Sequence, residues 1–370
     1  MSPLHELLVR LAPEHLAAHG GRMPHAQVRA LESILSCRTP ALGGSLMRCT
    51  GCEREVFTYH SCNHRACPQC GGRDTGEWTL RQTERLLPVP YFLVTFTLPE
   101  PLRALARDHP VPLLDLLFNA SSQALKTVAS LPRQLGGQLG FTGFLHTWTR
   151  QLAWHPHVHY IVAGGGLSPE GKRWIECRQP DWLFPVKLLS AEYRKAMDEA
   201  LRARQPALHA QVPPACWSGP WVVHCQSAGS GANVVRYLAR YVHRTALSEE
   251  RLVEAKDGKV TISYTDSTTG KPGRCTFTQD EFLRRYLQHV LPPGLKRIRY
   301  YGWMHPSAVH RRMIVENLLG KGIALRDPPP PPPDWSRLCP HCEQFLLVEV
   351  RKLHPVRGRF ACHRRAAKPP

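Results

Sequence analysis

The chain has 370 residues, enough for two domains and a sizeable core. Its 48 Lys and Arg against 29 Asp and Glu give a formal charge of +19 and a pI of about 9.7. This excess predicts a polyanionic partner, and nucleic acid is the first candidate. An anionic membrane surface is disfavoured, because the basic residues are spread along the whole chain and no window has the apolar length of a membrane span.

The cysteines and the N-terminus together indicate a compartment. Met1 to Glu6 lacks the basic-then-apolar order of a secretory signal. Without export, the 13 cysteines are expected to be metal ligands and buried thiols rather than disulfides. We therefore expect a cytoplasmic protein.

The first 80 residues predict a helical lead-in followed by a zinc site. Apolar residues recur at helical spacing within 4–36. Two Cys-x-x-Cys knuckles then follow, Cys49 with Cys52 and Cys67 with Cys70. Paired knuckles at this separation match a structural zinc ion held by four thiolates better than they match unconnected buried thiols. The remaining candidates could complete a second site or pack nearby: Cys37, Cys62, His60 and His64.

Alternation and helical periodicity predict the elements of a mixed α+β domain over 88–320. The expected strands cover residues 91–98, 141–148, 157–163, 221–226, 259–266 and 274–278. The expected helices cover residues 113–128, 190–204 and 233–244. The strands 141–148 and 157–163 are close in sequence and predict an antiparallel hairpin.

The strand after Pro156 carries His157 and His159, which project from one face because strand side chains alternate. Two imidazoles on one face suit a divalent metal. The alternative is a half-exposed strand with ordinary polar residues. A third ligand stays open, with Gln151 and Asn233 as guesses.

The helix at 233–244 carries Tyr237 and Tyr241 one turn apart. Its apolar stripe consists of Val235, Leu238, Ala239 and Val242. The tyrosines lie off this stripe, which argues against a role in core packing and leaves an exposed polar face as the alternative.

Two further segments favour DNA binding. Residues 296–303 mix basic and aromatic side chains, a combination that stacks on bases and follows phosphates in single strands, although a solvated basic strand is nearly as well supported. After the proline run 328–333, the tail 327–370 carries Cys339-x-x-Cys342 and Cys362-His363, a second zinc knuckle of poorer match. Beyond Glu349 the tail is basic and is expected to be mobile chain that binds DNA.

The histidines and the tyrosines together suggest a reaction. A metal held by His157 and His159 can act as a Lewis acid on a phosphodiester, and a tyrosine oxygen can attack it to form a phosphotyrosine bond. Because that bond conserves the ester, the strand can be rejoined without a nucleotide cofactor. A second tyrosine permits a second attack while the first remains loaded.

The sequence resembles the rolling-circle transposases of the insertion sequence 91 family, within the HUH endonuclease superfamily. The resemblance covers most of the chain and rests on the following motifs: Cys37-Arg38-Thr39 with Leu42-Gly43-Gly44, the two cysteine knuckles, His155-Pro156-His157-Val158-His159 with Gly164-Gly165-Gly166-Leu167, and Tyr237-Leu238-Ala239-Arg240-Tyr241.

The resemblance implies an antiparallel sheet with flanking helices, preceded by a small helical zinc-binding domain. It also implies Mg²⁺ or Mn²⁺ on the histidines, structural Zn²⁺ on the cysteines, and single-stranded DNA at element ends plus target DNA as partners. Tyr237 would cleave, keeping the 5′ phosphate, and Tyr241 would serve the partner step. Ser45 and Ala66 stand where the family commonly has histidine, which argues against a second zinc ion.

Two other functions are compatible with these residues. A relaxase or replication initiator would use the same chemistry on different DNA. A zinc-dependent DNA-binding regulator without catalysis would explain the charge and the cysteines, but it would leave the two histidines and the tyrosine pair unexplained.

Overall fold

A computed structural model describes residues 2–70, 72–242, 246–266, 269–321 and 338–356. Contacts divide the chain into two compact units, which are described separately. Unit 1 combines residues 1–72, 247–290 and 325–370, and unit 2 combines residues 73–246 and 291–324. The domain ranges expected from the sequence (1–80, 88–320 and 327–370) stay a prediction.

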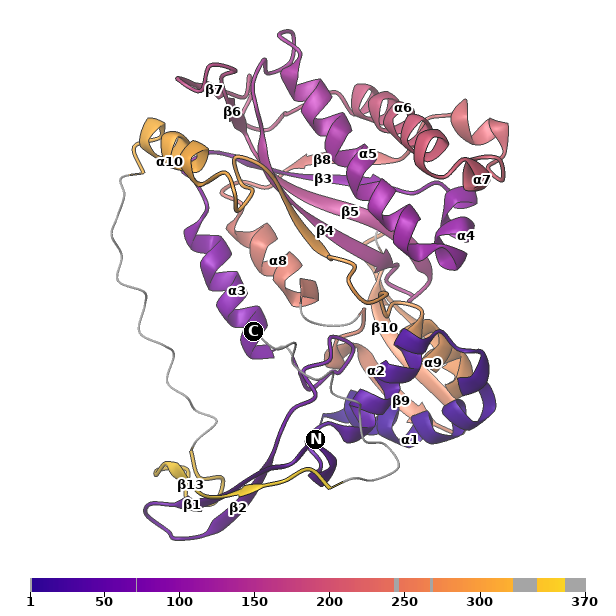
Figure 1. Cartoon of the computed structure of the whole chain (residues 1–370), viewed down its shortest axis with the longest axis vertical. Helices are drawn as coiled ribbons and strands as arrows, with labels where there is room; N and C mark the ends of the chain where they lie inside the picture. Colours follow the sequence, from indigo (N-terminus) through magenta and orange to yellow (C-terminus); the bar gives the residue numbers. More distant parts are fainter. Residues whose placement is uncertain (1, 71, 243–245, 267–268, 322–337, 357–370) are drawn as a thin grey trace. The chain divides into compact units, whose positions relative to one another are not determined.

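Unit 2 is built on a five-stranded antiparallel sheet with the order β12-β4-β5-β3-β8 (Figure 1). Its strands are β3 (Tyr91–Thr97), β4 (Gly140–Trp148), β5 (Trp154–Ala163), β8 (Val223–Ser227) and β12 (Ile298–Gly302). The expected hairpin forms, with β4 and β5 paired antiparallel. A small two-stranded sheet, β6 (Gly165–Leu167) with β7 (Trp174–Glu176), follows β5.

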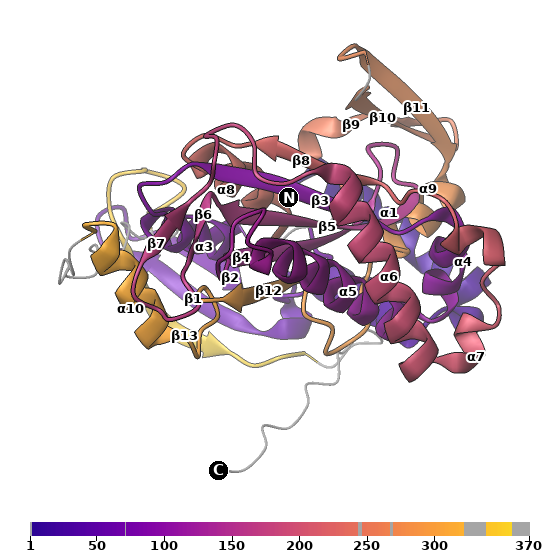
Figure 2. The same cartoon turned by 90° about the horizontal axis from the view of Figure 1, so that it is seen from above.

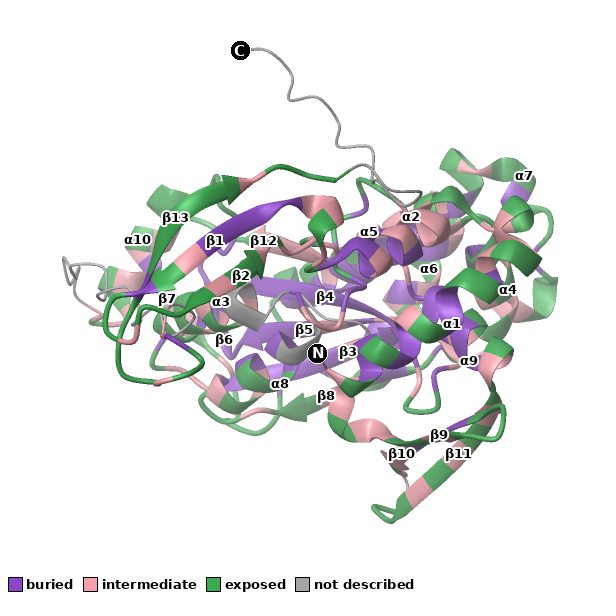
Figure 3. Ribbon diagram, turned by 90° about the horizontal axis from the view of Figure 1, so that it is seen from below, coloured by how far each residue is buried: buried purple, intermediate pink, exposed green. Residues whose placement is uncertain are grey.

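One face of this sheet is covered by helices that follow its strands. Phe92, Val158 and Tyr160 point to this face and pack into the large apolar core. The covering helices are α4 (Glu100–Asp108), α5 (Pro110–Ser130), α6 (Val186–Arg204) and the short α7 (Pro206–His209). Figure 2 shows α5 and α6 lying along the sheet, and Figure 3 shows that β4 is buried throughout, whereas β5 is fully buried only in its second half. The predicted α+β class, with an antiparallel sheet and flanking helices, is confirmed.

The opposite face is covered by α3 (Gly72–Glu84), α8 (Ala232–Val242) and α10 (Val309–Leu318). A second core forms there, in which Leu93 and Ile161 of the sheet pack with Leu238 of α8. Trp78 of α3 meets the Phe144 ring edge-on at 5.6 Å between centroids. Because strand side chains alternate, this is also the face that receives His157 and His159.

The described residues of unit 1 form three α-helices and two small sheets. Its helices are α1 (Pro3–His19), α2 (His25–Ser36) and α9 (Gln279–Leu287). One sheet has the order β13-β1-β2 and the other the order β11-β10-β9. The strands are β1 (Gly44–Cys49), β2 (Glu55–Tyr59), β9 (Leu252–Lys256), β10 (Lys259–Thr265), β11 (Pro272–Thr278) and β13 (Leu347–Leu353).

The expectation that the tail is mobile beyond Glu349 is wrong for its first residues. Residues 350–353 continue β13, which pairs antiparallel with β1 some three hundred positions earlier. The backbone hydrogen bonds of an added edge strand and the burial of Leu347 fix this stretch. Residues 357–370, including Cys362 and His363, lie outside the described residues. Among the helices within the described ranges, none is long and apolar enough to cross a membrane.

Candidate metal centre and tyrosine helix

Three histidines converge on one face of the sheet in unit 2. His157 and His159 come from β5, and His146 of β4 stands directly opposite His157 in the strand register. The ligand atoms of the three residues lie within 4.8 Å of one another. The two β5 rings meet edge to face at 4.8 Å between centroids, and His146 lies 4.7 Å from His159 by the same measure.

Neighbouring groups hold two of the rings by their Nδ1 atoms. The Nδ1–H of His157 donates to the carbonyl oxygen of His155 at 2.6 Å. The Nδ1 of His159 lies 2.7 Å from the hydroxyl of Thr95, which faces it from β3. With Nδ1 engaged, each ring keeps Nε2 for another partner. This arrangement, in which an outer group fixes the ring and leaves the other nitrogen available, is typical of metal-bound histidine.

Burial keeps the three imidazoles uncharged. Loss of solvent is the largest cause that lowers the pKa of His146 and of His157 well below the usual range, and the neighbouring imidazoles add to it. Burial also lowers the pKa of His159 to about 4. Neutral imidazole is the form that binds a metal, so the three rings are ready to act as ligands at neutral pH.

The donor set fits a divalent transition ion. Three imidazole nitrogens suit ions such as Mn²⁺ better than they suit Mg²⁺, which prefers oxygen ligands and retains its waters. The third ring, that of His146, is held by stacking. It lies on the Trp148 ring at 4.7 Å between centroids, and the centroid of the Trp148 ring lies 5.7 Å from the guanidinium carbon of Arg297.

His146 is the candidate metal ligand that sequence reasoning missed. The strand 141–148 and its hairpin with 157–163 were both predicted, so aligning the two strands could have placed His146 beside His157. The two guesses for a third ligand lie elsewhere: Gln151 is exposed in the turn after β4, and the side-chain oxygen of Asn233 accepts a hydrogen bond from Arg236 at 2.6 Å.

Helix α8 packs on the same face of the sheet as the histidines. Val235, Leu238 and Ala239, the apolar stripe that the sequence predicts, are at most 2% exposed within the second core. The helix begins next to β3, because Gly231 at φ +78° lies against the Tyr91 ring, where a Cβ would come within 2.8 Å of a ring carbon. A side chain there would force the Tyr91 ring or the start of α8 to shift.

Of the two tyrosines on α8, only Tyr237 has a side chain within the described part of the structure. Tyr237 lies off the buried stripe and is 42% exposed, as the helical spacing predicts. The backbone of Tyr241 belongs to α8, but its side chain lies outside the described residues.

The cysteines form two four-thiolate clusters in place of the single one expected. Cys67 and Cys70 group with Cys37 and Cys62, whereas Cys49 and Cys52 group with Cys339 and Cys342. The prediction that Cys49, Cys52, Cys67 and Cys70 share one zinc ion is therefore wrong. Neighbouring sulfurs in both clusters lie 3.6 Å apart. A tetrahedral zinc ion with Zn–S of about 2.3 Å separates its sulfurs by about 3.8 Å, so both clusters fit Zn²⁺.

The β1–β2 hairpin explains this separation. Cys49 and Cys52 lie at the hairpin tip, whereas the base is closed by hydrogen bonds from His60 to Gly43 and from Arg38 to His60. Cys37 and Cys62 lie beside that base. Five paired residues at about 3.4 Å each hold the tip about 17 Å from the base, too far for one ion.

The second cluster also corrects the expectation that Ser45 and Ala66, in place of histidines, argue against a second zinc ion. Neither position supplies a ligand to either cluster: the Ser45 hydroxyl bonds Glu349 of β13, and the Ala66 carbonyl accepts the Tyr286 hydroxyl. The absence of histidine there therefore does not argue against two zinc ions. The tail knuckle Cys339–Cys342, predicted with Cys362 and His363, instead joins Cys49 and Cys52.

The basic and aromatic segment 296–303 is only partly available to DNA. Trp303 is 1% exposed and donates its ring N–H to the Gln138 carbonyl, so it cannot stack on a base. Tyr301 stacks on Phe141 at 4.9 Å. A groove of about 810 Å³ remains along the edge strand β12, with Lys296, Arg299, Tyr300 and His305 among its lining residues.

Comparison with known proteins shows the family. A family model described as "Putative transposase" matches residues 140–312, and one described as "Transposase zinc-binding domain" matches residues 8–98. The "Putative transposase y4qJ" of Sinorhizobium fredii (strain NBRC 101917 / NGR234) is 35% identical over 369 residues, covering 91% of this chain and 92% of its own. The "Transposase for insertion sequence element IS801" of Pseudomonas savastanoi pv. phaseolicola is 29% identical over 308 residues, covering 78% and 73%.

No solved structure matches the chain. The two relatives and both family models are transposases or parts of them, and the zinc-binding match falls on the region that carries six of the clustered cysteines. The chain belongs to the insertion sequence 91 family of transposases. DNA is accordingly its substrate, and structural zinc fits its cysteine clusters.

Proposed function

We propose that this transposase cleaves and rejoins single-stranded DNA at element ends through a phosphotyrosine intermediate, in the manner of HUH endonucleases. His146, His157 and His159 hold a catalytic divalent ion, Mn²⁺ or Mg²⁺. The observation that carries the proposal is the convergence of three neutral imidazoles on the sheet face that α8, the helix with Tyr237, also covers. A regulator without catalysis would have no need of that convergence.

The chain's own residues supply the nucleophile. Tyr237 is 42% exposed on a helix held in place by a buried stripe, so part of this residue is open to a DNA strand. The Tyr237 oxygen forms a bond to phosphorus and the bond from phosphorus to the 3′ oxygen breaks. The phenol loses its proton to solvent, and the 3′ oxygen takes one up. The 5′ phosphate then stays on the protein, and a free 3′ hydroxyl is left to prime replication.

The ion supplies one part of this chemistry when it is bound. It acts as a Lewis acid that withdraws charge from the phosphodiester and orients it. A phenol has an ordinary pKa of about 10, so a neighbouring cation also favours the phenolate. Tyr241 serves the second strand-transfer step, and reversal of the first step rejoins the strand without a nucleotide cofactor.

The basic surface of unit 2 is suited to hold the strand. The groove along β12 is lined by Lys296, Arg299 and Tyr300, and the guanidinium of Arg85 lies 5.8 Å from the Tyr300 ring. The cations can follow the phosphates, and Tyr300 is the ring of the segment left to contact bases. Single-stranded element ends and target DNA are the proposed partners.

A cleavage assay tests this proposal. Labelled single-stranded oligonucleotides from element ends are incubated with the protein and Mn²⁺ or Mg²⁺, and denaturation-resistant adducts are measured. We expect His157→Ala with His159→Ala to abolish adducts while DNA binding persists. His109→Ala, an exposed histidine at the start of α5 on the opposite face of the sheet, is the matched control and should cleave normally. Full cleavage by the double variant would refute the proposed metal centre.

A further inference from the structure

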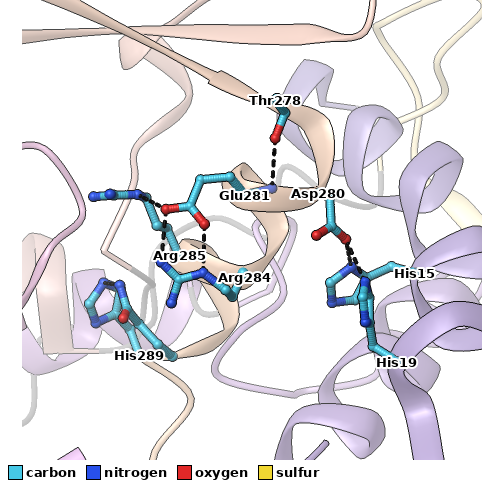
Figure 4. A network of polar contacts seen from close by, with 9 residues as sticks. His15, His19, Thr278, Asp280, Glu281, Arg284, Arg285 and His289 are labelled. Carbon is cyan, nitrogen blue, oxygen red and sulfur yellow. Dashed lines mark hydrogen bonds and ion pairs between the residues drawn. The ribbon is translucent and has the colours of Figure 1, made fainter.

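A third group of metal-ligating side chains lies in unit 1, apart from the cysteine clusters. His15 and His19 of α1 both point toward Asp280 of α9 (Figure 4). The Nδ1 of His15 and the Nε2 of His19 lie 2.8 and 2.9 Å from the same carboxylate oxygen. All three ligand atoms lie within 4.8 Å of one another.

The spacing on α1 explains why the two rings meet. Residues four apart share a face of a helix, and the ring centroids of His15 and His19 are 4.7 Å apart. Two histidines at this spacing chelate zinc in other proteins. Thr278 caps α9 by accepting the Glu281 N–H, and this cap fixes the first turn of the helix, from which Asp280 projects.

The surroundings leave room for an ion. A pocket of about 290 Å³ adjoins the three side chains and is also lined by Glu14 and Gln279. His15 is buried and His19 is half-buried, so an ion there would be partly shielded from solvent. A carboxylate and an amide at the pocket wall could hold the water molecules that complete its coordination.

We propose that His15, His19 and Asp280 bind a divalent transition ion, zinc in the first place, that joins α1 to α9. Two imidazole nitrogens and one carboxylate oxygen are a donor set that zinc commonly takes in proteins. The arrangement requires no thiolate and is independent of the catalytic histidines of unit 2.

A metal ion at this site would join separate stretches of the chain within unit 1. The unit is assembled from three separate stretches of chain. Cys49 and Cys52 with Cys339 and Cys342 join the first stretch to the last, across 293 positions between Cys49 and Cys342. His15 and Asp280 join the first stretch to the middle one, across 265 positions. A metal that closes so long a loop offsets the entropy lost when distant segments are held together.

The competing account is a network of hydrogen bonds without an ion. Neutral tautomers of both histidines could each donate an N–H to Asp280, which would satisfy all three groups. That account predicts no dependence on zinc, so metal content and zinc-dependent stability distinguish the two.

The experiment measures zinc per full-length chain and the shift of Tm on addition of Zn²⁺ alone. Relative to wild type, His19→Gln and Asp280→Asn should each contain about one zinc fewer per chain and should lose the part of the Tm shift due to this site. His19→Cys replaces one zinc ligand by another and should retain the ion. His209→Gln is the matched control, because it breaks a histidine–aspartate pair at 2.6 Å that lies outside any ligand cluster of the described residues.

The variants also separate loss of zinc from loss of folding. If His19→Gln unfolds, Asp280→Asn compared with a folded His19→Cys protein decides the question: one zinc fewer in Asp280→Asn supports the site, and equal zinc content in the two variants excludes it. Wild-type zinc content and an unchanged zinc-dependent Tm in both His19→Gln and Asp280→Asn would overturn the proposal and leave only the hydrogen-bond network.

Discussion

The hydroxyl of Thr95 on β3 lies 2.7 Å from the Nδ1 of His159 on β5, in a register that places the two residues side by side. The contact joins β3 to β5, the strand that carries two of the three proposed metal ligands. It sets the orientation of His159 without changing what the ring can bind. Residues of this kind influence metal affinity although they never touch the ion.

Removal of this hydroxyl should weaken metal binding while leaving the fold intact. We expect Thr95→Val to lower the affinity for Mn²⁺ by about tenfold to a hundredfold, because the His159 ring loses the group that orients it. Calorimetric titration of the full chain measures this change.

Thr142→Val is the matched control for Thr95→Val. Thr142 is a buried threonine on β4, and its hydroxyl has no hydrogen-bond partner among the residues that the structure describes. This substitution should leave the Mn²⁺ affinity unchanged. Equal affinities for wild type and Thr95→Val would show that the hydroxyl does not orient the ring.

His146 should behave as a metal ligand and not merely as a packed core residue. His146→Gln should abolish DNA cleavage and lower Mn²⁺ affinity at least as strongly as His157→Ala does. The reason is that each removes one of three converging nitrogens. The measurement is cleavage and metal titration of both variants side by side.

Two outcomes would contradict the role of His146. A His146→Gln protein that folds, binds Mn²⁺ with unchanged affinity and cleaves DNA would exclude it as a ligand. If the His146→Gln protein cleaves normally and loses cleavage only when Gln151 is also replaced, Gln151 is the third ligand instead.

Metal affinity at the histidine centre should depend weakly on pH down to about pH 5.5. Ligand histidines must be uncharged, and here burial lowers the pKa of His159 to about 4 and those of His146 and His157 well below normal. Protons therefore compete only as the pH falls toward these lowered values. Three ordinary histidines, with pKa values of about 6.5, would lose about a thousandfold in affinity by pH 5.5. Mn²⁺ titrations at several pH values measure the slope, and a steep loss below pH 6.5 would contradict the burial argument.

The two cysteine clusters predict which pairs of mutations combine. Cys49→Ser and Cys339→Ser should each remove the same zinc ion, so the double variant should lose no more zinc than either single one. Cys49→Ser with Cys67→Ser should lose two ions, because these cysteines lie in different clusters. Zinc content per chain measures this. If the double variant Cys49→Ser with Cys67→Ser loses only one zinc ion, the two cysteines bind the same ion, and the assignment to two clusters is contradicted.

Much of unit 2 could be predicted from its sequence. Strands β3, β4 and β5 are apolar runs with clear boundaries, and the apolar stripe of α8 predicted that Tyr237 would be exposed. These features depend on local periodicity, which a sequence displays directly. The position of His146 opposite His157 depends on strand register, which follows from the length and bulge of the β4–β5 connection and is not visible in either strand alone.

Unit 1 was less predictable because its contacts are distant in sequence. Spacing alone favoured one zinc ion for Cys49, Cys52, Cys67 and Cys70, since knuckles close in sequence are commonly close in space. The β1–β2 hairpin separates the two knuckles in space, and the pairing of β13 with β1 brings Cys339 and Cys342 to the first of them. The same holds for Asp280, whose partners on α1 precede it by more than 260 positions.

The most direct test of the proposed mechanism is to identify the residue that carries DNA after cleavage. Wild-type protein is reacted with a single-stranded element end and Mn²⁺, digested with protease, and the DNA-linked peptide is mapped by mass spectrometry. We predict a phosphodiester on Tyr237, lost in Tyr237→Phe and kept in Tyr59→Phe. Cleaved DNA with no attached peptide, or a linkage that maps to a residue outside α8, would contradict the phosphotyrosine mechanism.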